Sequence, residues 1–499
     1  MQKITSGQVR ALYSVAQTRQ LENLASLQLP AHALMERAGL AVAKLALALA
    51  PHAQRIWIAC GPGNNGGDGL EAARHLQRWG KQPIVSWLGE LDRAPTDTLI
   101  AYRQLEHQGV TVYNDPPLRV DLGIDALLGI GGHLRAPTDR LAFFMNCLND
   151  SAATVLSVDV PSGLDADTGC VSALHVRADH TLSLLTLKPG LFTASGRDAA
   201  GTIWCDSLAV DPDEHGQHLP AAQLLARSTP AARPHASHKG SYGDVAIVGG
   251  ASGMVGAALL SARAALHAGA GRVFVGLLDQ CAMAVDPLQP EIMFRTAETL
   301  SLANMVTVFG CGGGVIDEDC LKRVLSSESP VVIDADAINK ISSEPRFQVL
   351  LTHRTTRGAA TVLTPHPLEA ARLLGLGAAQ VQANRLEAAQ ALSERYACTV
   401  ALKGSGTIVS APGRNSGVNP TGNAALATAG TGDVLAGMIG ANLAQGLEAF
   451  EATCQAVYRH GELADTWHGN APLTASKLAS LPASRVQQKA SWSPSPCGT

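Results

Sequence analysis

The chain has 499 residues, of which 46% are apolar and only 4% aromatic, and its formal charge is −4 at neutral pH. This length exceeds what one hydrophobic core supports and predicts two or three domains, while the slightly acidic balance excludes the basic surface of a nucleic-acid-binding protein. The longest apolar run, Ala38–Ala50, is too short to cross a membrane, and ten cysteines without metal-binding spacing indicate reduced thiols in a cytoplasmic protein.

The N-terminal half alternates helical patterns with short apolar runs. Helices are expected over Ser6–Leu27, His32–Leu49, Leu70–Trp79 and Thr96–His107. Strands are expected over Arg55–Cys60, Pro83–Leu88, Val120–Leu128, Ala153–Val160 and His180–Leu187. Strand–helix alternation of this kind predicts a parallel sheet that is covered by helices on both faces.

Three of these strands run into polar, glycine-containing turns. The first is followed by GPGNNGGDG (Gly61–Gly69), the second ends near Asp125, and the third ends at Asp159 with Ser162 close behind. Each turn alone is more often an ordinary strand ending than a site. Three at the carboxyl ends of strands in one sheet predict a ligand crevice, and their amide and carboxylate oxygens suit a hard cation.

A composition shift separates the two halves. Asp211–His238 is rich in proline, alanine and polar residues, with only a brief helical patch, and we interpret it as a connector. Its His235 and His238 are better read as solvated loop residues than as ligands. The predicted boundaries are a first domain at 1–212, a linker at 213–236, a second domain at 237–483 and a disordered tail at 484–499.

The C-terminal half shows the same alternation of strands and helices, but its sequence does not repeat that of the N-terminal half. Strands are expected over Asp244–Val248, Arg272–Leu277, Val306–Phe309, Pro330–Asp334, Thr361–Thr364, Thr399–Leu402 and Gly406–Val409. Helices are expected over Val255–Ala268, Val381–Glu394 and Asp433–Leu447. Polar residues again follow the strands, which places them on one ligand-binding edge of a sheet.

The stretch NPTGNAALATAGTGD (Asn419–Asp433) carries the most chemical information in this half. Gly430 and Gly432 allow a tight turn whose N–H groups converge at the start of a helix, and such a turn binds anionic oxygens. Asp433 follows at once, and an acid beside a phosphate cradle suggests phosphoryl transfer to an alcohol. The alternative is a plain turn before a core helix, with Asp433 as its N-cap.

The N-terminal half resembles NAD(P)H-hydrate epimerase over about Met1–Ala209. The resemblance rests on LMERAG (Leu34–Gly39), GPGNNGGDG, DALLGIG (Asp125–Gly131) and VDVPSGLDADTG (Val158–Gly169). It implies a Rossmann-like fold, one bound potassium ion, and interconversion of the R and S forms of nicotinamide hydrates at C6. The implied substrate contacts are Asn64, Asn65, Gly66, Gly67, Asp68, Gly129, Ile130, Gly131, Gly132, His133, Leu134 and Arg135.

The resemblance also assigns roles in this half. Asn65, Asp125 and Ser162 would contact potassium, and Asp159 would bind the substrate beside C6 and act as the catalytic carboxylate. A carboxylate there can shuttle a proton and stabilise the cation that forms when the ring hydroxyl leaves. No second acid–base group is identified; His133 is a candidate, although a loop histidine is more often incidental.

The C-terminal half resembles the ADP/ATP-dependent NAD(P)H-hydrate dehydratase family over about Ser237–Ser480. The motifs are HKGSYG (His238–Gly243), TPHPLE (Thr364–Glu369), LKGSGT (Leu402–Thr407) and Asn419–Asp433. The implied fold is ribokinase-like. The implied hydrate contacts are Ala257, Gly312, His366 and Asp433, and the implied nucleotide contacts are Lys403, Gly404, Ser405, Gly406, Thr407 and Gly432. From the residues alone, Lys403 could equally be a solvated lysine and His366 a turn residue.

Together these resemblances predict an α/β chain with an N-terminal Rossmann-like parallel-sheet domain and a C-terminal ribokinase-like α/β domain. The implied function is repair of hydrated nicotinamide cofactors: epimerisation of (R)- and (S)-NAD(P)HX, then dehydration of the S form, with Asp433 as base. ADP is expected to supply the phosphoryl group, giving AMP and phosphate. Potassium in the first domain, Mg²⁺ with the nucleotide in the second and a homo-oligomer are also expected.

Three further points accompany this prediction. Cys311 stands where the dehydratase family usually has proline, which puts the geometry of that turn in doubt. Glu369 is the best protein candidate near Mg²⁺, but more readily caps a helix. The alternative functions are a ribokinase-type small-molecule kinase fused to a nucleotide-binding module, and a sensing or partner-binding role for the N-terminal half.

Overall fold

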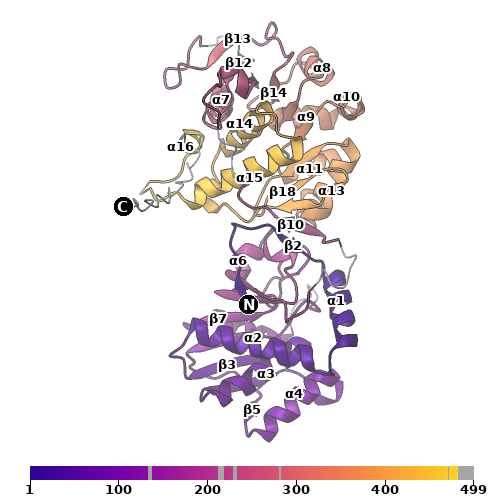
Figure 1. Cartoon of the computed structure of the whole chain (residues 1–499), viewed down its shortest axis with the longest axis vertical. Helices are drawn as coiled ribbons and strands as arrows, with labels where there is room; N and C mark the ends of the chain where they lie inside the picture. The colour runs from indigo at the N-terminus through magenta and orange to yellow at the C-terminus, as the bar shows by residue number, and fades with distance from the viewer. Residues whose placement is uncertain (133–137, 212–218, 229–232, 280–282, 470, 481–499) are drawn as a thin grey trace, which may run out of the picture.

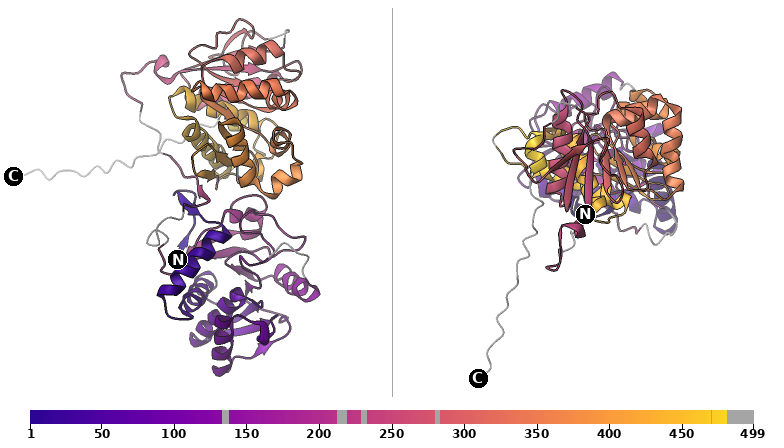
Figure 2. Two further views of the ribbon diagram at one scale, coloured as in Figure 1. Left: turned by 90° about the vertical axis from the view of Figure 1, so that its right-hand side faces the viewer. Right: turned by 90° about the horizontal axis from the view of Figure 1, so that it is seen from above.

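The computed structural model describes residues 1–132, 138–211, 219–228, 233–279, 283–469 and 471–480. Two α/β domains are stacked end to end along the long axis of the molecule (Figures 1 and 2). Each is built on its own sheet, which confirms the predicted α/β class. Within the described residues, no helix combines the length and the apolar character that a membrane span requires.

The N-terminal sheet has the strand order β1-β9-β8-β7-β6-β3-β4-β5, and only the β1–β9 pair is antiparallel. Its strands are β1 Gln2–Lys3, β3 Arg55–Cys60, β4 Gln82–Trp87, β5 Val112–Tyr113, β6 Leu122–Ala126, β7 Thr154–Val158, β8 His180–Leu184 and β9 Thr202–Asp206. The helices of this domain are α1 Val15–Gln28, α2 Ala33–Leu49, α3 Asn64–Arg78, η1 Leu91–Arg93, α4 Thr96–His107, α5 Asp139–Asn149, η2 Pro189–Leu191 and α6 Gly196–Ala200.

Both faces of this sheet are buried, as a parallel sheet requires. Successive side chains of a strand point to opposite faces. Along β3, Ile56 and Ile58 therefore pack into the cluster that contains α2 and α3, while Trp57 packs with Phe144 of α5 in another.

The C-terminal sheet has the order β13-β12-β11-β14-β15-β16-β17-β18-β19-β10-β2. Its strands are β10 Ala222–Leu224, β11 Asp244–Gly249, β12 Arg272–Leu277, β13 Met293–Thr296, β14 Val306–Phe309, β15 Val331–Ile333, β16 Thr361–Leu363, β17 Thr399–Leu402, β18 Ile408–Ser410 and β19 Ser416–Val418, with β2 Arg10–Leu12 from the N-terminal segment. The run from β13 to β17 is parallel throughout, and β18 pairs antiparallel with both β17 and β19.

Helices cover both faces of this sheet as well. Along β11, Val245 and Ile247 pack in the cluster that holds α7, α14 and α15, while Ala246 and Val248 pack in the one that holds α8 to α11. The helices are η3 Lys239–Tyr242, α7 Val255–His267, α8 Glu318–Ser326, α9 Ala335–Ser343, α10 Pro345–Thr356, α11 Pro367–Leu374, α12 Ala378–Ala383, α13 Arg385–Tyr396, η4 Ala424–Leu426, α14 Thr431–Ala444, α15 Ala449–Asp465 and α16 Ala475–Ser480.

Several predicted helices are wrong in extent, among them the one expected over Leu70–Trp79, which begins earlier, as α3. The helix expected over Ser6–Leu27 begins only at α1, because the side chain of Ser14 caps it with Gln17 in a capping box. The residues before this cap form β2 instead. The helix expected over Val381–Glu394 is divided into α12 and α13 at Asn384, whose side chain accepts a hydrogen bond from the N–H of Glu387 at 3.2 Å.

The connector also differs from the prediction. It holds the strand β10 rather than a helical patch, and β10 pairs with β19 on one side and β2 on the other. Leu12 and Leu224 are fully buried there, so burial of apolar side chains favours the strand. The predicted tail at 484–499 and part of the predicted linker lie outside the described residues.

Candidate active sites

The carboxyl ends of β3, β6 and β7 open onto a cavity of about 460 Å³ in the N-terminal domain. Its wall includes eight residues predicted from three separate strand ends: Asn64, Asn65, Asp68, Gly129, Ile130, Gly131, Gly132 and Asp159. The structure therefore brings these residues together. His133, Leu134 and Arg135 lie outside the described residues.

Gly66 and Gly67 do not line the cavity, because the glycine-rich motif is partly helix. The motif was expected to be a loop up to Gly69, but α3 already begins at Asn64. A Cβ on Gly66 would lie 2.0 Å from the carbonyl oxygen of Gly61, and one on Gly67 would lie 2.5 Å from Cε of Met35. These glycines let α3 pack closely on its neighbours and so present Asn64, Asn65 and Asp68 to the cavity.

Asp159 is held in an unusual backbone conformation directly after β7. Its φ is +66°, in the left-handed region that few non-glycine residues adopt, and its side chain is almost fully buried. The carboxylate accepts hydrogen bonds from the backbone N–H of Leu184 and from Nζ of Lys188. Local strain of this kind concentrates at functional sites, so the geometry is consistent with the predicted catalytic role.

Lys188 is a functional candidate that the sequence did not reveal. It is fully buried, and besides Asp159 its ammonium contacts the hydroxyl of Ser183 and the carbonyl oxygen of Leu184 at 3.3 and 2.7 Å. A buried ammonium beside a carboxylate can hold or release a proton at the cavity wall. The only signal for it was a single charge at the end of an apolar run, Leu184–Lys188.

Two more acids face the same cavity. Burial, with the nearby charge of Asp159, raises the pKa of Glu22, and it raises the pKa of Asp68 well above its ordinary value. Glu22 belongs to α1, whose pattern carried no chemical signal. The cavity thus combines a carboxylate–ammonium pair with carboxyl groups of raised pKa, which suits proton transfer.

Asp125 and Ser162, two of the three predicted potassium contacts, touch each other beneath the cavity. The carboxylate of Asp125 accepts from Oγ of Ser162 at 2.6 Å, from its N–H at 2.9 Å and from Oγ of Ser157 at 2.7 Å. All three residues are fully buried, and burial raises the pKa of Asp125. Asn65, the third, packs on Gly129, and its buried amide nitrogen has no partner among the described residues.

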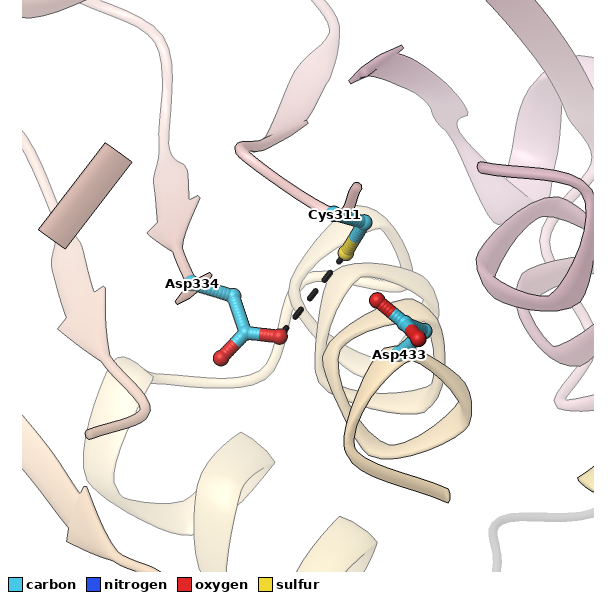
Figure 3. Close-up of side chains that lie close together, drawn as sticks. All are labelled: Cys311, Asp334 and Asp433. Carbon is cyan, nitrogen blue, oxygen red and sulfur yellow. Dashed lines mark hydrogen bonds between the residues drawn. The ribbon is translucent and has the colours of Figure 1, made fainter. Parts of the chain in front are cut away.

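A second group of polar residues lies at the carboxyl ends of β14 to β17. Cys311, Asp334 and Lys403 each follow one of these strands. Asp433 approaches Cys311 and Asp334 from the first turn of α14 (Figure 3). Ligand atoms of Cys311, Asp334 and Asp433 lie within 4.8 Å of one another, and the thiol donates to Asp334 at 3.8 Å. This arrangement confirms that the polar strand ends of the C-terminal sheet converge.

Asp433 lies in the first turn of α14 but is not its N-cap. The cap is Gly430, with φ +92°, so the alternative of a plain N-cap is wrong. Burial, reinforced by the charge of Asp334, raises the pKa of Asp433 to about 6, and the nearby thiol of Cys311 acts against this shift. A carboxylate with a pKa near neutrality is suited to accept a proton from a hydroxyl.

Lys403 links this acidic group to the predicted nucleotide loop, Lys403–Thr407. Its ammonium contacts Oδ1 of Asp334 at 2.7 Å, and a Cβ on Gly432 would lie 3.4 Å from the same nitrogen. The loop thus adjoins the N-terminus of α14, where backbone N–H groups attract anions. The alternative of a solvated lysine is wrong, because only 19% of the Lys403 side chain is exposed.

Ala257 and Gly312, two of the predicted hydrate contacts, lie in contact with each other, since a Cβ on Gly312 would come within 2.8 Å of Cβ of Ala257.

His366, another predicted hydrate contact, is the N-cap of α11, and its Nδ1 accepts hydrogen bonds from the N–H groups of Leu368 and Glu369. The carboxylate of Glu369 accepts a hydrogen bond from the N–H of His366 at 2.7 Å and so caps the helix, as expected. Nε2 of His366 lies 3.3 Å from the Glu369 carboxylate, and burial lowers the pKa of His366.

Cys311 does not disrupt the turn in which it replaces the expected proline. Gly310 and Gly312 on either side have φ of +108° and +57°, and the Cys311 carbonyl accepts a hydrogen bond from the N–H of Gly250 at 2.9 Å.

His460 is another residue near this site that the sequence did not indicate. Its Nε2 contacts the carbonyl oxygen of Thr431 at 2.9 Å, and burial lowers its pKa to about 4. A neutral imidazole thus supports the start of α14.

Both halves of the chain match known proteins. Residues 245–483 match a family model described as NAD(P)H-hydrate dehydratase, and residues 31–190 match the YjeF-related protein N-terminus. The bifunctional NAD(P)H-hydrate repair enzyme Nnr of Escherichia coli (strain K12) is 36% identical over 454 residues, which cover 88% of this chain and 86% of that protein. The ADP-dependent (S)-NAD(P)H-hydrate dehydratase of Neisseria meningitidis serogroup B is 44% identical over 256 residues, covering 50% and 85%.

Among solved structures, the ADP/ATP-dependent NAD(P)H-hydrate dehydratase from Bacillus subtilis co-crystallised with ATP/Mg²⁺ is 28% identical and covers 50% of this chain and 91% of that chain, with a TM-score of 0.42.

The chain belongs to the family of bifunctional NAD(P)H-hydrate repair enzymes. The prediction of a fused epimerase and dehydratase, made from the sequence motifs, is thereby confirmed.

Proposed function

We propose that the N-terminal cavity interconverts the two epimers of NAD(P)HX and that the Asp433 site dehydrates the S epimer to NAD(P)H, with ADP as phosphoryl donor. The observation that carries the proposal is the placement of Asp433. Its carboxylate has a raised pKa of about 6 and stands at a helix N-terminus beside Lys403. This combination unites a base for a hydroxyl with an anion-binding site for the phosphates.

In the epimerase step, the C6 hydroxyl takes up a proton and leaves as water, while the lone pair of the ring nitrogen forms an iminium ion. Water then adds to C6 from the other face and loses a proton. Asp159 is positioned to stabilise the cation, and Lys188, in contact with it, is the second acid–base group. Asp68 and Glu22, whose pKa values are raised by burial, are further acid–base groups in the same cavity.

The buried oxygens beneath the cavity fit the expected potassium ion. Asp125 supplies one negative charge and Ser162 and Asn65 supply neutral oxygens, a set that suits a hard cation. The buried carboxylate has a raised pKa, and a bound cation would offset its desolvation. When bound, potassium would order the loop that follows β6, because the N–H of Leu128 already bonds to Ser162 at 2.8 Å.

In the dehydratase step, Asp433 accepts the proton of the C6 hydroxyl, whose oxygen attacks the terminal phosphorus of the nucleotide. The bond from that phosphorus to the bridging oxygen breaks, and AMP leaves when the donor is ADP. The C6–O bond then breaks with departure of phosphate, helped by the ring nitrogen, and loss of a proton from C5 restores the dihydronicotinamide. Lys403 and the N–H groups at the start of α14 stabilise the transferred charge.

The residues near Lys403 support Mg²⁺ carried by the nucleotide rather than held in a protein cage. Glu369 is engaged with the backbone of its own helix, and the Cys311, Asp334 and Asp433 cluster includes a thiol, a ligand that Mg²⁺ disfavours. When bound, Mg²⁺ would neutralise phosphate charge. These residues therefore fit an Mg²⁺ ion that is carried by the nucleotide.

Several finer assignments rest on the relatives. ADP as donor and the S epimer as substrate follow the ADP-dependent (S)-NAD(P)H-hydrate dehydratase, which is 44% identical over half of this chain. We also propose domain limits at 1–212 and 237–483 and a homo-oligomeric state. A ribokinase-type kinase is the alternative function, and it would release a stable phosphorylated product.

The direct test mixes the purified chain with (S)-NADHX and either ADP or ATP and follows the absorbance of reduced nicotinamide together with free phosphate. We expect both to rise in equal amounts, and Asp433→Asn to abolish both while NMR still detects epimerisation. Accumulation of a phosphorylated hydrate without NADH would support the kinase instead. No absorbance gain with either nucleotide would overturn the proposal.

A further inference from the structure

The nucleotide loop Lys403–Thr407 is in direct contact with the N-terminal domain. The contact comes from residues 188–196, here called the cross-domain segment, which follow the end of β8 and include η2. The N–H of Ala194 donates to the carbonyl oxygen of Ser405 at 3.2 Å. The hydroxyl of Thr193 lies 3.2 and 3.3 Å from the carbonyl oxygens of Ser405 and Gly406.

The fit between loop and segment leaves no room for a larger residue. A Cβ on Gly406, whose φ is +61°, would lie 2.0 Å from the carbonyl oxygen of Phe192. The glycine in this loop is therefore required by a residue of the other domain as well as by its own backbone conformation.

Arg385, the first residue of α13, completes the contact from the side of the C-terminal domain. Its buried guanidinium donates to the carbonyl oxygens of Leu402 and Lys403, both at 3.2 Å, and its Nε donates to Oγ1 of Thr193, also at 3.2 Å. Burial lowers the pKa of Arg385 to about 10. Among the residues that the structure describes, this buried guanidinium has no carboxylate partner, so it depends on oxygen acceptors, which also include Oε1 of Gln382 at 2.6 Å. It thereby ties Thr193 to the loop backbone.

The cross-domain segment is itself anchored in the N-terminal domain. The N–H of Gly190 donates to the carbonyl of Ala166 at 2.7 Å, and that of Ser195 donates to Gly169 at 3.1 Å. A Cβ on Gly196 would lie only 1.7 Å from the carbonyl oxygen of Gly190, so the segment is tightly folded on itself. It presents a fixed surface to the loop.

These contacts determine which way the loop peptides face. In a trans peptide the carbonyl oxygen and the following N–H point in opposite directions. The carbonyls of Lys403 and Ser405 are turned towards Arg385 and Thr193. The N–H groups of Gly404 and Gly406 consequently point away from the domain contact, in an orientation that lets them meet an anionic ligand.

We propose that Thr193 is a positioning residue for the dehydratase: through its hydroxyl and Arg385, the N-terminal domain holds the nucleotide loop of the C-terminal domain in its binding conformation. The inference rests on the proposed nucleotide-binding role of Lys403–Thr407. It predicts that ADP affinity in the C-terminal site depends on a side chain of the epimerase domain that touches neither substrate.

The test is Thr193→Val in the full chain, which keeps the shape of the side chain but removes the hydroxyl. We expect the KM for ADP in dehydration and the Kd for ADP by calorimetry to rise about tenfold, the effect of losing one buried hydrogen-bond network. The kcat of dehydration and the rate of epimerisation should stay close to the wild-type values. Thr193→Ser, which retains the hydroxyl, should restore ADP affinity.

Tyr458→Phe is the matched control. The hydroxyl of Tyr458 also donates across the domains, to the carbonyl of Ser6 at 2.8 Å, but its bond does not involve the nucleotide loop. We expect this variant to bind ADP normally. An equal loss of ADP affinity in both variants, or a Thr193→Val chain with a lowered melting temperature and impaired epimerisation, would reduce Thr193 to a general structural contact and overturn the proposal.

Lys403→Ala separates this inference from the function on which it rests. If Lys403→Ala weakens ADP binding and Thr193→Val does not, the loop binds nucleotide but needs no support from the N-terminal domain, and the inference is wrong. If neither substitution changes ADP binding, the assignment of the nucleotide site itself is wrong.

Discussion

At the scale of residues, the two proposed catalytic aspartates have different surroundings. Asp159 is held by the ammonium of Lys188, whereas the ammonium nearest to Asp433 contacts Asp334 instead. Burial and the charge of Asp334 raise the pKa of Asp433 to about 6. The environment fits the roles: one carboxylate remains paired beside a cationic intermediate, and the other is available to take a proton from a hydroxyl.

The first prediction concerns the pH dependence of dehydration. Asp433 accepts a proton only when ionised, and the protonated form predominates below its pKa of about 6. The kcat/KM for (S)-NADHX should be flat above about pH 7 and fall about tenfold per pH unit below the pKa. Initial rates between pH 4.5 and 8.5 check this, and a profile without an inflection in that range would contradict the role of Asp433.

The second prediction concerns Cys311, whose thiol lies close to Asp433 and opposes its raised pKa. Cys311→Ala removes this polar contact and should move the inflection of the pH profile upwards by up to about one unit, since a polar contact to a charged group is worth at most roughly 1.5 kcal/mol. Cys311→Ser, with a hydroxyl in place of the thiol, serves as control and should leave the inflection near its original position. A downward shift in the alanine variant would show that the thiol does not stabilise the ionised carboxylate.

At the scale of elements, glycine motifs place the functional side chains by permitting close packing. α3 begins inside GPGNNGGDG, and α14 begins inside the GTGD turn. In both cases the sequence predicted where the site lies but put the helix start too late. The reason is that glycine usually indicates a loop, whereas Gly66 and Gly67 are helical residues without space for a side chain.

The third prediction follows from that packing. A Cβ on Gly66 would overlap the carbonyl of Gly61, so Gly66→Ala must move α3 away from the loop that follows β3. We expect a loss of stability of about 1–3 kcal/mol in the N-terminal domain and at least a tenfold loss of epimerase activity. Chemical denaturation and separate assays check this. Gly63→Ala, where a Cβ meets nothing within 4 Å, is the control and should fold normally.

Motif residues at strand ends could be predicted from sequence because parallel strands deliver their carboxyl ends to one edge. Lys188, Glu22 and His460 could not, because each stands in a run whose pattern indicates only a strand or a helix. Their roles depend on neighbours that are distant in sequence: Glu22 faces Asp159, and His460 meets Thr431. The same is true of Arg385 and Thr193, which are 192 residues apart.

At the scale of the whole molecule, the two halves are joined by more than a connector. β2 from the N-terminal segment and β10 from the connector form the edge of the C-terminal sheet, and one hydrophobic cluster contains residues of both domains. Leu12 and Leu191 share this cluster with Leu402. Sequence composition indicated a boundary near Asp211, but it could not reveal that a strand before the first helix belongs to the second sheet.

The central claim is that two separate sites act in sequence on one damaged cofactor. The most direct measurement follows the absorbance of reduced nicotinamide when a mixture of R and S hydrates is supplied with ADP. Wild-type chain should convert the whole mixture, Asp159→Asn should stop once the S share is consumed, and Asp433→Asn should convert none. Both variants together should restore full conversion, because the S epimer released by one chain can be dehydrated by the other. Failure of the two variants to complement, or full conversion by Asp433→Asn alone, would contradict the account.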